Sequence, residues 1–239
     1  MNPPRTTPAA ELFEDARRAR RVGTGLLAAA AAYAVAAAMM GLVFASSPPP
    51  RLLEALADFE QGQALYQWGF VGASLLAPVF VAILLLLAAA AGVPATAVRR
   101  SVAGVLLGAY VALASVAYTS QYTFFPDLVG RDPEAAALWY FHDVDSIPYA
   151  IDLAGYALLG VASLLLASIL AERGRRWLAG WLAAMGALSV AAFVLHAAGV
   201  GALAGAVSLT SAALSVPVAA LAFIEGRRLR ADASAGPAC

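Results

Sequence analysis

Residues 177–223 decide the fold: they read WLAGWLAAMGALSVAAFVLHAAGVGALAGAVSLTSAALSVPVAALAF. The run contains no Asp, Glu, Lys or Arg, and it is more than twice as long as the about 20 apolar residues that one transmembrane helix needs. It therefore has to cross a membrane twice. Gly199 and Gly201 lie near its middle, where glycine permits a tight turn, so we predict helices over 177–197 and 201–223.

Four further apolar runs precede this one, and each is close to the length of a single crossing. They predict helices over 23–45, 69–92, 102–125 and 148–171. The whole chain is 62% hydrophobic and only 13% charged, whereas soluble proteins carry about 25% charged residues, so a lipid bilayer has to cover the surplus apolar surface. The sequence predicts an all-α polytopic membrane protein of six transmembrane helices.

The basic residues predict the orientation of these helices. All 15 are arginine, and with six crossings nearly all of them fall on one side. Cytoplasmic loops carry the excess of Lys and Arg, so we expect a multi-pass protein of a bacterial inner membrane with both termini in the cytoplasm. The expected domains are a cytoplasmic Arg-rich segment over 1–22, a membrane domain over 23–225 and a cytoplasmic tail over 226–239. Only two arginines fall on the opposite side, Arg51 and Arg131.

Two outer loops are long. Within the first, about 46–68, Leu52, Leu56 and Phe59 recur at helical spacing and predict a short amphipathic helix on the membrane surface. The second, about 126–147, is rich in Asp and Glu.

Composition also excludes several chemistries. Without lysine the chain forms no Schiff base, and with Cys239 as its single cysteine it has no internal disulfide. The zero formal net charge gives no reason to expect nucleic acid as a partner. No GxSG motif of an intramembrane serine protease and no HExxH motif is present. We expect no cofactor, and a non-enzymatic role is favoured over catalysis.

Asp152 is the first candidate for a functional residue. It lies about one turn inside the predicted helix over 148–171, where a carboxylate is costly and usually faces a cavity or a partner. Tyr149 and Tyr156 stand three residues before and four after it, on the same helical face. Either Asp152 binds a ligand or proton, or it makes a structural hydrogen bond to a neighbouring helix.

The helix over 102–125 carries a matching polar stripe at the same depth. Tyr118, Gln121 and Tyr122 follow helical spacing, and Gln67 and Trp68 lie at the mouth of the helix over 69–92. A few convergent polar groups in an aromatic cleft are typical of small-molecule sites. An interhelical polar clasp with an aromatic belt would give the same pattern, and the sequence does not separate the two.

Two further candidate features each contain a histidine. His196, near the Gly199 turn, would either bond the backbone of that turn or join the polar pocket. His142, Asp143 and Asp145 form H-D-x-D, which offers metal ligands by type. Their spacing matches no dedicated site, so they are weak candidates and we predict no metal.

The stretch from Tyr118 to Tyr156, YTSQYTFFPDLVGRDPEAAALWYFHDVDSIPYAIDLAGY, resembles a pattern in uncharacterised six-helix bacterial membrane proteins. In those, an aromatic-Gln segment ends one helix, an acidic loop follows, and the next helix opens with an acid shortly before Gly-Tyr. The matching positions are Gln121, Asp152, Gly155 and Tyr156. The resemblance implies that Gln121 and Asp152 matter and implies no activity.

Together these features favour small-molecule binding or transport. The ligand would be an apolar or cationic small molecule held in the outer half of the second to fifth helices, with Asp152 as counter-charge. A six-helix chain without an internal repeat is small for a secondary transporter, so we also expect a homo-oligomer. The alternatives are a non-catalytic membrane subunit or assembly partner, and a membrane enzyme acting on lipids with Asp152 and His196 as acid and base. The expected lining residues are Asp152, Gln121, Tyr118, Tyr122, Tyr156, Trp68 and His196.

Overall fold

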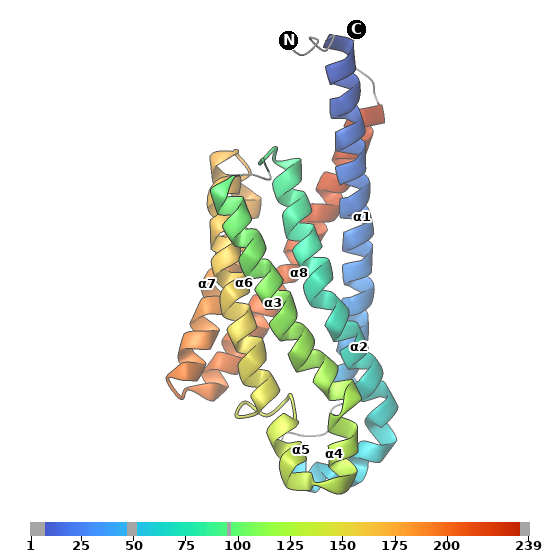
Figure 1. Ribbon diagram of the computed structural model, residues 1–239, viewed down its shortest axis with the longest axis vertical. Coiled ribbons are helices and arrows are strands. Elements are labelled where there is room, and N and C mark those ends of the chain that lie inside the picture. Colours follow the sequence, from blue (N-terminus) through green and yellow to red (C-terminus); the bar gives the residue numbers. More distant parts are fainter. Residues whose placement is uncertain (1–7, 47–51, 95–96, 235–239) are drawn as a thin grey trace, which may run out of the picture.

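The computed structural model describes residues 8–46, 52–94 and 97–234, and all regular secondary structure in these ranges is helical (Figure 1). Six of the described helices are long and apolar enough to cross a membrane, which confirms the predicted number. A helix satisfies its backbone N–H and C=O groups internally, as the lipid interior demands. The spanning helices are α1 (Pro8–Ser46), α2 (Leu52–Ala90), α3 (Val98–Thr123), α6 (Ile147–Glu172), α7 (Arg176–Ala197) and α8 (Gly201–Ser234).

The long apolar run divides where the sequence predicted. α7 ends at Ala197 and α8 begins at Gly201. Gly199 between them has a φ of +77°, a left-handed conformation that glycine adopts without a steric penalty. Its N–H and that of Val200 bond back to carbonyls of the last turn of α7, so the helix end is satisfied by its own backbone.

The six spanning helices form a closed ring. Each packs against the next spanning helix along the chain, and α8 returns to pack against α1. α6, which stands between α3 and α7 in Figure 1, is the most buried of the six. The helices before and after the acidic loop, α3 and α6, are direct neighbours.

Pairs of glycines allow two of these helix contacts to be very close. A Cβ atom at Gly160 of α6 would lie 2.7 Å from the carbonyl oxygen of Gly186 of α7. A Cβ at Gly23 of α1 would lie 2.8 Å from the carbonyl oxygen of Gly226 of α8. Small residues at such crossings let backbones approach where lipid supplies no hydrophobic force between helices.

The end of the molecule that holds α4 (Phe125–Arg131) and α5 (Pro133–Trp139) differs from the sequence expectation in two ways. The predicted surface helix near Leu52 is wrong as a separate element, because residues from Leu52 onward continue directly into α2. The acidic loop is also not irregular throughout: α4 and α5 each begin at or next to a proline, which fits the first turn of a helix.

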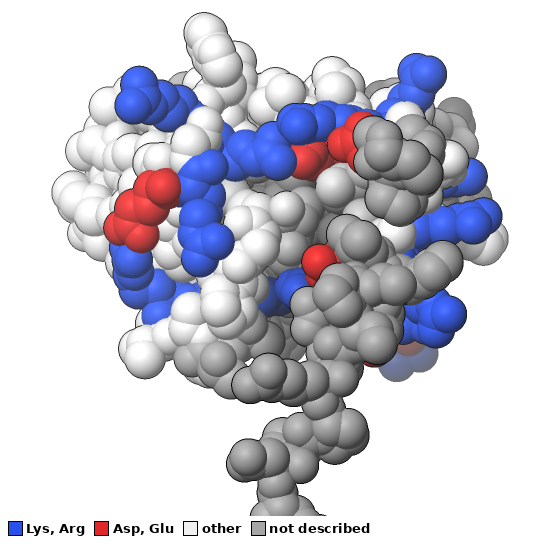
Figure 2. Space-filling model, turned by 90° about the horizontal axis from the view of Figure 1, so that it is seen from above, with Lys and Arg blue, Asp and Glu red and all other residues white. Residues whose placement is uncertain are grey.

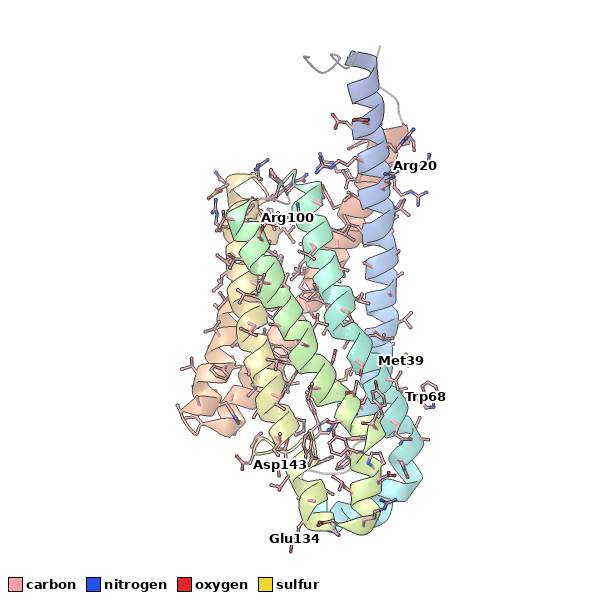
Figure 3. The ribbon with its side chains drawn as sticks, viewed as in Figure 1. Arg20, Met39, Trp68, Arg100, Glu134 and Asp143 are labelled. Atoms are coloured by element: carbon pink, nitrogen blue, oxygen red, sulfur yellow. The ribbon has the colours of Figure 1, made fainter. Side chains whose placement is uncertain are left out.

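Charge is distributed unequally between the two ends of the ring. Figure 2 looks onto the end where the chain termini lie and shows arginines spread around its rim. In Figure 3, Arg20 and Arg100 lie at this end, and Glu134 and Asp143 lie at the other. We refer to them as the arginine end and the acidic end.

Candidate functional site

A cavity of about 440 Å³ lies inside the half of the ring nearer the acidic end. Helices α1, α2, α3, α6 and α8 and the segment between α5 and α6 contribute to its wall. The volume falls within the range of about 300–1,000 Å³ that is usual for small-molecule pockets. Its lining residues are Met40, Leu76, Tyr118, Phe141, His142, Val144, Tyr149, Asp152, Tyr156, Gly205, Ser208, Leu209 and Ala212.

Asp152 of α6 is the acidic side chain in this wall. Only 7% of it is exposed, and Tyr118 of α3 interacts with its carboxyl group. Its Oδ1 atom has no hydrogen-bond partner among the described residues. None of the described residues lining the cavity is an arginine, so the protein itself places no fixed cation beside this carboxyl.

Tyrosines supply most of the remaining polar surface. Tyr118, Tyr149 and Tyr156 all line the cavity, and the hydroxyl of Tyr149 is buried without a partner among the described residues. Helical spacing explains why Tyr149 and Tyr156 share the face of Asp152. The cavity therefore combines one carboxyl group with aromatic rings, which is a suitable environment for a cation or a protonated amine.

Gln121 does not line the cavity; it forms a separate polar cluster. The side chain is fully buried, and its Oε1 accepts hydrogen bonds from the Tyr66 hydroxyl at 2.7 Å and from the Phe141 backbone N–H at 3.2 Å. Its Nε2 donates to Ser120 Oγ at 2.8 Å and to the Trp139 carbonyl at 2.9 Å. An amide side chain has two donors and two acceptor sites, so none of its capacity remains for a ligand.

The other expected lining residues lie elsewhere. Trp68 is 60% exposed, and Figure 3 shows it pointing away from the helix ring. Tyr122 is half-buried, and its hydroxyl accepts from Ser74 Oγ at 3.5 Å. His196 touches the site only indirectly, with its ring centroid 5.7 Å from that of Tyr149. The structure thus gathers Asp152, Tyr118 and Tyr156 of the predicted set and separates the rest.

The histidine-aspartate segment contributes a wall residue. His142 lines the cavity, and burial lowers the pKa of its imidazole to about 4, because desolvation disfavours the charged form. Asp143 instead accepts a hydrogen bond from the Asp145 backbone N–H at 3.0 Å. Among the described residues, no group of three or more His, Cys, Asp or Glu side chains converges in a way that could hold a metal ion.

Residues of α8 and α1 are the part of the wall that the sequence did not indicate. Gly205, Ser208 and Ala212 of α8 face the cavity, as does Met40 of α1. The side chain of Ser208 donates a hydrogen bond to the Gly205 carbonyl of its own helix at 2.9 Å. Only the closure of the ring brings α8 next to Asp152, and this long-range pairing has no local signal.

Two smaller cavities continue along the ring. One of about 90 Å³ lies deeper; it shares Leu76, Tyr118 and Tyr156 with the main cavity and adds Tyr33 of α1 and Ser215 of α8. The other, of about 270 Å³, lies at the arginine end. There Arg175 and Glu225 form an ion pair of 2.8 Å.

Comparison with protein-family models, with curated proteins and with solved structures finds no match to this chain.

Proposed function

We propose that this chain binds a cationic or apolar small molecule in the membrane, with Asp152 as the anchoring group, and moves it between the two faces. One observation carries the proposal. Asp152 is a nearly fully buried carboxyl that faces a cavity of about 440 Å³, and one of its oxygens has no partner in the part of the chain that the structure describes. An ionisable group inside a membrane-spanning segment is costly and usually marks a ligand or ion pathway.

The proposed setting is a bacterial inner membrane with the arginine end in the cytoplasm. The gathering of arginines at one end and acids at the other supports this orientation, since cytoplasmic loops are the basic ones. The main cavity then lies in the outer half of the membrane and both termini are cytoplasmic. The homo-oligomer expected from the sequence stays a prediction.

Movement of a ligand would require the inner half of the ring to part. Leu84 of α2 and Leu166 of α6 are each 1% exposed. Along their helices they fall between residues that line the deeper cavity and residues that line the cavity at the arginine end, which supports an apolar barrier between the two spaces. A bound cation would have to displace this barrier to reach the arginine end.

The lipid-enzyme alternative is less well supported, because its base is not in place. His196 does not line the cavity that contains Asp152. His142 does line it, but with a pKa near 4 it is a weak base. A carboxyl surrounded by tyrosines fits recognition better than acid–base chemistry.

The test is native mass spectrometry of the protein released from nanodiscs, for the wild type and for Asp152→Asn. We expect a bound small molecule in the wild type that is absent from the variant. Asp145→Asn is the matched control, because Asp145 is an exposed acid of the same end and should leave the ligand in place.

Two results would contradict the proposal. If wild type and Asp152→Asn both carry no ligand, even after incubation with dodecyltrimethylammonium, Asp152 is structural. If both carry the same protein partner and nothing else, the chain is better described as a non-catalytic subunit.

A further inference from the structure

The closure between α1 and α8 is tight in only one half of the ring. At the arginine end, Gly23 and Gly226 bring the two backbones together, and further along, Tyr33 and Ser215 form a hydrogen bond. Beyond this point the helices separate: in Figure 1, α8 runs obliquely from beside α1 at the arginine end to beside α7 at the other. The main cavity lies on the side where they have parted.

The burial of residues along one face of α8 decreases in the same direction as the two helices separate. Gly226, Ala222 and Ala219 are buried, and continuing on the same face at steps of three and four residues, Ser215 and Ala212 are only partly so. Ser208 and Gly205, next on this face, are also partly exposed. Met40 on the facing side of α1 is likewise half-buried. The inner part of this face meets α1, and the outer part meets the cavity.

The acidic end of the cavity is covered by the segment before α6. Phe141 packs its ring 5.3 Å from that of Phe70 and 5.4 Å from that of Tyr118. Val144 lies against the start of α8, where a Cβ at Gly201 would be 3.2 Å from its side chain. Aromatic and apolar side chains therefore stand between the cavity and the outer water phase.

The rim between the parted helices has a different character. Leu209 lines the cavity and is also 57% exposed, on the outer, lipid-facing surface of a spanning helix. Because Leu209 lies on both the cavity wall and the outer surface of α8, it marks the place where the cavity meets the bilayer. The outer surface of a spanning helix faces hydrocarbon, so a ligand that enters past Leu209 comes from the membrane.

From this geometry we infer that the cavity opens sideways into the outer leaflet between α1 and α8, and that its ligand is a cationic amphiphile. The inference rests on the proposed function and adds the route of entry and the ligand class. The ammonium head would lie beside Asp152 among Tyr118, Tyr149 and Tyr156, whose ring faces attract cations. The alkyl tail would leave past Leu209 and stay in the bilayer, which needs no further volume inside the protein.

The experiment uses a quencher on the tail of the ligand. In a Cys239→Ser background, Leu209→Cys and, separately, Val116→Cys are labelled with bimane in phosphatidylcholine nanodiscs. Val116 is the matched control: it is 51% exposed and lies two residues from Tyr118, so it has similar depth and exposure away from the cavity. The probe is dodecyltrimethylammonium with a brominated tail, and native mass spectrometry verifies that each labelled protein still binds it.

We expect quenching at position 209 to contain a saturable component that Asp152→Asn removes. Position 116 should show only the linear component of probe dissolved in lipid. If the probe binds in an Asp152-dependent way but both positions show only the linear component, the sideways opening is wrong and the proposed function stands. If no Asp152-dependent binding is found, both the sideways opening and the proposed function are wrong.

Discussion

Gln121 and Asp152 are buried polar residues on adjacent helices, near the same end of the ring, and they are in opposite states. Gln121 has a partner for every donor and acceptor that it carries. Asp152 has an oxygen with no partner among the described residues and an open space beside it. Buried polar groups normally have hydrogen-bond partners. We therefore interpret the Gln121 cluster as structural and the Asp152 cavity as a ligand-binding site.

The largest effect that would test this comparison is the loss of the Gln121 cluster. Gln121→Leu removes the partner of the buried Phe141 N–H and of the part-buried Trp139 carbonyl, and it removes one interaction of the Tyr66 hydroxyl. Each such group costs about 1–3 kcal/mol, so we expect the free energy of unfolding to fall by about 4 kcal/mol. Unfolding in mixed micelles of increasing dodecyl sulfate content measures it.

Gln67→Leu is the matched control, since Gln67 is a half-buried glutamine of the same region. It should change stability by less than about 1 kcal/mol, as substitutions away from a buried network usually do. An equal loss in both variants would mean that the Gln121 bonds contribute no special stability.

An intermediate effect is expected at His142, where the two regions meet. Burial holds the pKa of its imidazole at about 4 in the folded protein, against about 6.5 when exposed. Between these pH values only the unfolded state takes up the proton, so stability is full above about pH 6.5 and falls as the pH drops towards 4. At about 1.4 kcal/mol per pH unit, the total loss is about 3 kcal/mol.

The readout is the difference between wild type and His142→Gln, which cancels the titration of acids common to both. Unfolding measured at several pH values should show the wild type losing more stability than the variant as the pH is lowered from 7 to 4. Parallel curves would show that His142 is more accessible to water than its burial indicates.

The smallest effect on stability is expected for Asp152→Asn. Its size distinguishes a ligand-binding role of Asp152 from a structural hydrogen bond. If the carboxyl is kept for a ligand, its neutral replacement changes the unfolding free energy of the empty protein by less than about 1 kcal/mol, because the amide oxygen of Asn can still accept from Tyr118. The same micelle titration measures this, next to Gln121→Leu. A loss as large as that of Gln121→Leu would make Asp152 a structural clasp as well.

The sequence was sufficient for features that depend on local chemistry. The number of spanning helices follows from the lengths of the apolar runs. The turn at Gly199 follows from the left-handed backbone conformation, which glycine adopts without a steric penalty. Asp152, Tyr149 and Tyr156 share a face because the helical repeat places them there. These predictions need no knowledge of which helices are neighbours in space.

The sequence was not sufficient for features that depend on how distant segments meet. Gln121 looked like a lining residue, and only the return of the chain over residues 139–141 shows that its amide is fully used. Ser208 carries no sequence signal of its own, because only the closure of the ring makes α8 a wall of the cavity that contains Asp152. Long-range pairing of this kind is set by the packing of whole helices and leaves no periodic trace in the chain.

The ring closure also has a consequence for biosynthesis. During synthesis, α6, which carries Asp152, leaves the ribosome well before α8, which completes the wall of the cavity. Until α8 inserts and docks against α1, through Gly23 and Gly226, the carboxyl of Asp152 stands in an unfinished bundle open to lipid on one side. A nascent chain paused before residue 201 would therefore hold the carboxyl of Asp152 without the wall that Gly205, Ser208 and Ala212 give its cavity.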